Sequence, residues 1–77
     1  MINNDFSIDF KKLGLKIAYY RKLKGYTQED MAEIMGVATS YIGAIEAPNM
    51  DKPISLTTLF RIAAILDTPA YKFLDFD

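Results

Sequence analysis

Apolar side chains recur every three or four positions in four stretches of the chain. This spacing places them on one face of an α-helix, and no stretch alternates as a half-buried strand would. A fifth, shorter helix near the end of the chain would be held by Phe73 and Leu74. The predicted buried faces are Phe10, Leu13, Ile17 and Tyr20 in residues 9–24; Met31, Ala32, Ile34 and Met35 in 27–35; Val37, Tyr41, Ile42 and Ile45 in 37–46; and Leu56, Leu59, Ile62, Ala63 and Leu66 in 55–66.

Residues that start and stop helices divide these stretches at consistent places. Thr27 can cap a helix whose first turn carries acidic residues, and Gly25 and Gly36 can supply the left-handed backbone that ends a helix. The remaining expected caps are Ser7 or Asp9, Ser55, and Thr68 followed by Pro69. We therefore expect an irregular N-terminal arm over residues 1–8 and one all-α domain over residues 9–77.

Residues 27–46 predict two short helices joined by a tight turn at Gly36, which is a helix-turn-helix. Gln28, Ala32, Gly36, Ile42 and Ile45 follow the spacing of DNA-binding motifs of this kind. From about Leu13 to Leu74 the chain resembles the phage-repressor family, the Cro and Xre-like helix-turn-helix domains. The resemblance implies a compact five-helix, lambda-repressor-like domain. It also implies a homodimeric, sequence-specific transcriptional regulator that inserts the helix at about residues 38–46 into the major groove of double-stranded DNA.

Composition narrows the chemistry that this chain can perform. Cysteine and histidine are absent, which excludes disulfides, thiol nucleophiles and soft metal sites. We expect no enzymatic activity, no metal and no cofactor. The net charge is −1 and the pI about 5.2, but six of the nine basic residues lie between Lys11 and Lys24. No apolar run is long enough to span a membrane, and without a secretory pattern the expected location is the cytoplasm.

The resemblance also assigns candidate DNA contacts by position. For Gln28 the alternative is an exposed glutamine without a DNA contact, and for Tyr41 it is an aromatic ring that fills the edge of the core. For the loop residues Asn49 and Lys52 the alternative is ordinary solvation. The expected base-facing residues are Thr39, Ser40, Gly43 and Ala44. The expected phosphate contacts are Thr27, Gln28, Tyr41, Asn49 and Lys52.

The resemblance further pairs Arg21 in the first helix with Glu46 at the end of the base-reading helix. The outer face of that helix carries no long polar side chain, so it lacks the paired hydrogen bonds that identify guanine or adenine. Ala38 stands where the family favours a serine cap, so we expect Thr39 to cap instead. Methyl groups and DNA shape would then favour a palindromic A/T-rich operator.

The helix at 55–66 is apolar beyond one face, which leaves two interpretations. Its extra apolar residues could form a dimer interface, or the last helix could fold back over them. A second reading of the whole chain is a protein-interaction module, antirepressor- or antitoxin-like, with weak or no DNA binding. The predicted dimer residues are Phe60, Ala64, Ile65, Tyr71 and Phe76.

Overall fold

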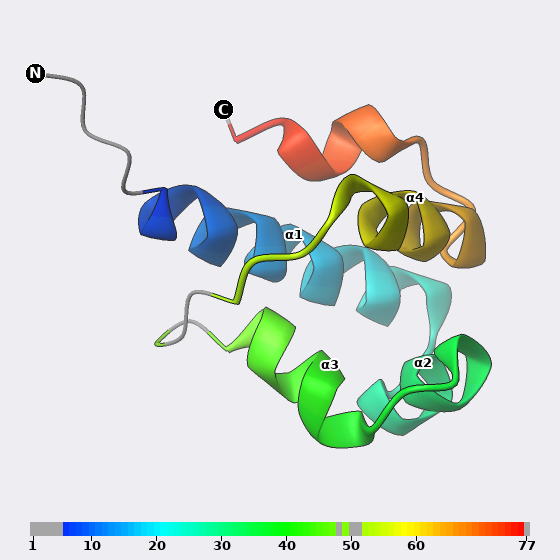
Figure 1. The fold of residues 1–77 in the computed structure, drawn as a ribbon. Helices are drawn as coiled ribbons and strands as arrows, with labels where there is room; N and C mark the ends of the chain where they lie inside the picture. The colour runs from blue at the N-terminus through cyan, green and yellow to red at the C-terminus, as the bar shows by residue number, and fades with distance from the viewer. Residues whose placement is uncertain (1–5, 48, 50–51, 77) are drawn as a thin grey trace, which may run out of the picture.

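Four α-helices and one 3₁₀ helix make up the parts of the chain that the structure, a computed structural model, describes: residues 6–47, 49 and 52–76. They are α1 (Ser7–Lys24), α2 (Gln28–Met35), α3 (Thr39–Glu46), α4 (Leu56–Ile65) and the 3₁₀ helix η1 (Ala70–Leu74). In Figure 1, α1 crosses the middle of the molecule, with α2 and α3 on one side and α4 and η1 on the other. The described residues contain no strand, which confirms the all-α prediction.

Helix α1 begins at Ser7, two residues before the predicted start. Phe6 occupies the N-cap position without a side-chain cap, and its carbonyl accepts a hydrogen bond from the amide of Phe10. The prediction that Ser7 or Asp9 caps this helix is therefore wrong, because both residues lie inside its first turn. Asp9 there faces the positive end of the helix dipole. Of the predicted arm, residues 1–5 lie outside the described part of the chain.

The turn residues at both ends of α2 behave as predicted. Thr27 accepts a hydrogen bond from the Asp30 amide at 3.0 Å, and the Asp30 carboxylate accepts one from the Thr27 amide at 2.8 Å. This reciprocal capping box satisfies two amides that the helix leaves unpaired. Gly25 and Gly36 end α1 and α2 with φ angles of +85° and +71°, which a side chain would strain.

The core forms where the buried faces of all five elements meet. Three predicted members are exposed instead. Ile34 lies beside the narrow stripe that α2 buries, and Leu56 is the first residue of α4, before that helix reaches the core. Leu74 follows a buried neighbour in η1, where three residues complete a turn and only one of two adjacent side chains can point inward. The buried apolar residues are Leu13, Ile17, Met31, Ala32, Met35, Ile42, Ile45, Leu59, Ile62, Ala63, Leu66 and Phe73.

The predicted cap of α4 is confirmed, whereas the predicted cap of the last helix is wrong. Ser55 caps α4 by accepting a hydrogen bond from the Thr58 amide at 3.1 Å, as expected. Thr68 does not cap the last helix: its hydroxyl donates to the Leu66 carbonyl, and Pro69 stands at the N-cap position of η1. Phe73 nevertheless anchors η1, because it is fully buried and packs edge-on against Tyr20 of α1.

Candidate nucleic-acid interface

Helix α3 is held against α1 by a direct contact between backbones. A Cβ atom built on Gly14 would overlap the carbonyl oxygen of Ile45, near the end of α3. Backbone cannot move aside as the end of a flexible side chain can, so only glycine allows the two helices to cross this closely. This contact sets how closely α3 approaches α1.

A buried ion pair fixes the end of α3 next to this crossing. Arg21 donates from Nε to Glu46 Oε2 at 2.7 Å and from Nη2 to Oε1 at 2.8 Å. A third bond runs from Arg21 Nη1 to the Tyr26 carbonyl at 2.7 Å. Arg21 is 6% exposed and Glu46 7%. The hydrogen bond with Glu46 raises the pKa of Arg21 above its ordinary value, against the opposing effect of burial.

Gln28 joins the same network from the start of α2. Its amide nitrogen donates to Glu46 Oε1 at 3.1 Å. A glutamine amide has two N–H donors, so one bond to Glu46 leaves the second N–H for another acceptor. The predicted phosphate contact is therefore a side chain whose direction is set by the same carboxylate that anchors α3.

The outer face of α3 carries only short side chains. Ser40 is exposed, and Thr39, Gly43 and Ala44 are partly exposed. Ala38 occupies the N-cap position with no side-chain bond, so the prediction that Thr39 caps α3 is wrong; Thr39 is the first residue of the helix. The four predicted base-facing residues thus lie on one short helix whose other face is buried.

Glycine at position 43 has no steric reason inside the molecule. Among the described residues, a Cβ built there would meet Gln28 Oε1 at 3.6 Å, an ordinary van der Waals distance. A mid-helix glycine lowers helix stability by roughly 1 kcal/mol relative to alanine. A contact within the chain requires glycine at position 14, whereas glycine at position 43 would be explained by the close approach of another molecule.

The other predicted phosphate contacts stand near the two ends of the motif. Lys52 places its ammonium 5.8 Å from the centroid of the Tyr41 ring. Tyr41 is partly buried against the core, whereas Asn49 and Lys52 are exposed. The structure therefore brings Lys52 to Tyr41 of α3, while Thr27 serves as the N-cap of α2.

One contact that supports the motif has no signal in the sequence. Arg61 of α4 donates from Nη2 to the carbonyl of Met35 at 2.9 Å. Met35 is the last residue of α2, where carbonyl groups lack helical partners and a cation is favourable. An arginine between apolar residues of α4 gives no hint of its distant acceptor, so only the fold reveals this link.

The predicted dimer residues divide into two groups. Phe60 and Ala64 of α4 and Tyr71 of η1 are exposed. Ile65 and Phe76 are partly buried and pack against the core of their own chain.

No helix in the described part of the chain is long and apolar enough to cross a membrane. No group of three or more acidic side chains within residues 6–47, 49 and 52–76 is arranged to hold a metal ion.

Two short helices joined at a left-handed glycine, the second lying across α1 with one face open, define a helix-turn-helix domain. The family model for the helix-turn-helix family HTH_3 matches residues 17–73. The chain belongs to this family.

Named relatives agree with this assignment. The chain is 40% identical over 63 residues to the HTH-type transcriptional regulator SinR of Bacillus subtilis, a match that covers 82% of this chain and 56% of SinR. It thus spans little more than half the length of that relative.

Solved structures share the fold. The restriction-modification controller protein C.AhdI from Aeromonas hydrophila superposes with a TM-score of 0.75 at 29% identity, covering 86% of this chain and 97% of that one. SinR in complex with DNA gives a TM-score of 0.71 at 40% identity, covering 82% and 98%.

Proposed function

We propose that this chain is a sequence-specific, DNA-binding transcriptional regulator that places α3 in the major groove. The observation that carries the proposal is the position of α3. Its inner face is fixed by Gly14 and the Arg21–Glu46 pair, while Ser40 and its neighbours remain open. SinR, which shares this fold at 40% identity, has been solved bound to DNA. The proposed function is binding rather than catalysis, and the proposed location is the cytoplasm.

The contacts divide between backbone and bases. Gln28, held by Glu46, offers its second N–H to a phosphate beside the amides at the start of α2, where the helix dipole favours an anion. Thr27, Tyr41, Asn49 and Lys52 complete the phosphate contacts. Thr39, Ser40, Gly43 and Ala44 face the bases. With no long polar side chain among the last four, methyl contacts and DNA shape favour an A/T-rich site.

The proposed regulator binds as a homodimer on a palindromic site. Phe60, Ala64 and Tyr71 form an exposed apolar surface on α4 and η1, away from α3. A symmetric dimer through this surface would present two copies of α3 to half-sites one DNA turn apart.

Selection of bound duplexes from a random pool tests the proposal, with sedimentation of the protein alone and with DNA. We expect an A/T-rich palindrome, two chains per site, and affinity that falls steeply as salt rises, because binding to phosphates releases counterions. A consensus rich in G·C at the half-site centres would contradict the A/T preference. One chain per site would contradict the dimer.

A second candidate function has one specific observation in its favour. α2 carries three exposed acidic residues, Glu29, Asp30 and Glu33, and neither α2 nor α3 carries a basic residue, which is unusual for a surface that meets phosphates. A protein-interaction module with this fold would show weak or no duplex binding even at low salt. The same salt titration therefore separates the two functions.

A further inference from the structure

Helix α1 has a second apolar face that the domain does not use. Ile8, Leu15, Tyr19 and Leu23 are each more than half exposed. Steps of seven and four residues place Ile8, Leu15 and Tyr19 on one side of the helix, and Leu23 follows one turn later. Leu13, Ile17 and Arg21, also spaced by four, form the buried side. A helix that is apolar on both sides normally has a partner on each.

This exposed face is also strongly basic. α1 carries six basic residues and one acidic residue, whereas the rest of the chain carries three basic and nine acidic ones. Lys12 and Lys16 lie among the exposed apolar residues, and Lys11 and Lys22 flank them. The chain as a whole is slightly acidic, so its positive charge is concentrated on this one helix.

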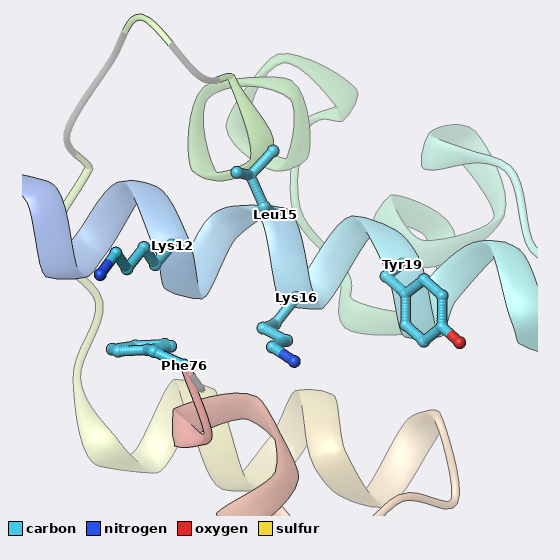
Figure 2. Close-up of a pocket in the computed structure, with 5 residues that line it drawn as sticks. All are labelled: Lys12, Leu15, Lys16, Tyr19 and Phe76. Atoms are coloured by element: carbon cyan, nitrogen blue, oxygen red, sulfur yellow. The ribbon is translucent and has the colours of Figure 1, made fainter.

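The face is indented where the C-terminal segment meets α1. Figure 2 shows Leu15, Lys16 and Tyr19 projecting from α1, with the ring of Phe76 beside Lys12. The Lys12 ammonium lies 5.8 Å from the centroid of that ring. The result is a shallow, mostly apolar groove with two ammonium groups at its edge.

We propose that this face of α1 docks an acidic amphipathic helix of a partner protein. Ile8 and Leu23 are separated by about 22 Å along the axis, the length of four helical turns. An apolar stripe of that length fits the apolar face of another helix, as in helix-in-groove recognition. Glutamate or aspartate residues flanking the partner's apolar stripe would meet Lys12 and Lys16.

Charge and shape argue against two other occupants. A second copy of the same face would bring lysines against lysines. An anionic membrane surface is broad and flat, so it would also approach the acidic remainder of the chain, whereas a single helix covers only the basic stripe. The face is distinct from the outer surface of α3, and the proposal does not depend on DNA binding.

The test is a selection from a displayed library of helical peptides about 18 residues long. Their apolar stripe is kept constant, and the flanking positions vary among Glu, Gln and Lys. We expect enrichment of Glu on the wild-type protein and a switch to Lys on the Lys12→Glu/Lys16→Glu variant. Enrichment of Gln or Lys on the wild type, or no enrichment, would overturn the proposal.

The selected peptide is then synthesised and titrated. We expect Tyr19→Ala to weaken binding about tenfold, as for a central aromatic anchor, and the double lysine reversal to weaken it at least about tenfold. Lys72→Glu, an equal charge change per residue on exposed η1, serves as the matched control and should change the dissociation constant less than about twofold. Lys12, Tyr19 and Lys72 are exposed and Lys16 is partly exposed, and none belongs to the buried core, so the variants should fold.

Two further experiments test the rejected occupants, a membrane surface and a second copy of the chain. Binding to phosphatidylserine vesicles that Lys12→Glu/Lys16→Glu abolishes, without peptide binding, would assign the face to a membrane. Self-association abolished by Leu15→Glu would assign it to a second copy. A saturating selected duplex should leave the peptide affinity within about twofold, so failure of DNA binding and failure of this proposal remain separate results.

Discussion

The two faces of α3 differ in how strictly the rest of the molecule constrains them. On the inner face, one backbone contact at Gly14 and two hydrogen bonds from Arg21 to Glu46 set the position of the helix. On the outer face, Ser40 and Gly43 touch little of their own chain. Changes on the inner face should therefore alter folding, and changes on the outer face should alter binding.

This contrast explains how a helix of eight residues can serve as a reading element. So short a helix is not stable by itself in water. Packing and the ion pair on the inner face stabilise this helix. The outer residues are therefore not needed for stability and can be those that fit a binding partner. The following substitutions test that division, beginning with the largest expected effect.

Arg21→Ala should destabilise the fold by about 3–5 kcal/mol, because it leaves the buried Glu46 carboxylate without its partner. Chemical denaturation of the purified variant measures this loss. A cost below about 1 kcal/mol would mean that the pair behaves as an exposed one and does not hold α3.

The double variant Arg21→Met/Glu46→Met is the control for this loss. Replacing both charges with apolar side chains of similar size removes the unpaired buried charge, so much of the stability should return. Gln28 would still lose its acceptor, so DNA affinity should stay below that of the wild type even where the fold recovers.

Gly14→Ala should destabilise the fold by about 1–3 kcal/mol, because the new methyl group would overlap the Ile45 carbonyl and push α3 away from α1. Thermal unfolding followed by circular dichroism measures the effect. Ala18→Gly, on the same helix at a partly exposed position, controls for the helix propensity of the two residue types. If Gly14→Ala proved as stable as the wild type, the close crossing of the two backbones would be disproved.

Gly43→Ala, on the outer face of α3, should stabilise the fold, whereas Gly14→Ala should destabilise it. A methyl group fits there, so the fold should gain up to about 1 kcal/mol, which raises the melting temperature by about 4–8 °C in a domain of this size. DNA binding should weaken, because the methyl group would stand between α3 and the duplex. A Gly43→Ala variant that is more stable than the wild type and binds DNA with equal affinity would show that Gly43 does not approach DNA.

Asp30→Asn should have the smallest effect, and one that depends on pH. Hydrogen bonds from the Thr27 amide and side chain lower the pKa of Asp30 in the folded state. A lowered folded-state pKa stabilises the fold above the unfolded value, near 4, and this contribution disappears as the pH falls through the folded value. The wild type should thus melt above Asp30→Asn at pH 7, and the two should converge below about pH 4; a constant difference would exclude this mechanism.

The sequence was sufficient to predict much of the fold because its signals are local. Thr27, Gly25, Gly36 and Ser55 mark helix ends through their own chemistry, and the structure places each at the predicted end. The errors arise where context decides. α4 ends without glycine, with Asp67 at a φ of +51°, and η1 tightens into a 3₁₀ turn that exposes Leu74. No local pattern distinguishes these outcomes from their alternatives.

The candidate site shows the same limit. The residues of the helix-turn-helix follow from spacing, but the bond from Gln28 to Glu46 and the bond from Arg61 to Met35 join residues 18 and 26 positions apart. Pairings at that distance depend on how the helices cross. The family resemblance pairs Arg21 with Glu46, and the structure shows that pair, but no pattern in the sequence indicates the acceptors of Gln28 and Arg61.

Backbone amide chemical shifts of the labelled protein, recorded with and without its selected duplex, test the central claim most directly. The account predicts that the largest shifts fall on Gln28 and on Thr39 to Ala44, with little change from Lys12 to Tyr19. Shifts concentrated on α1, with α3 unchanged, would contradict it.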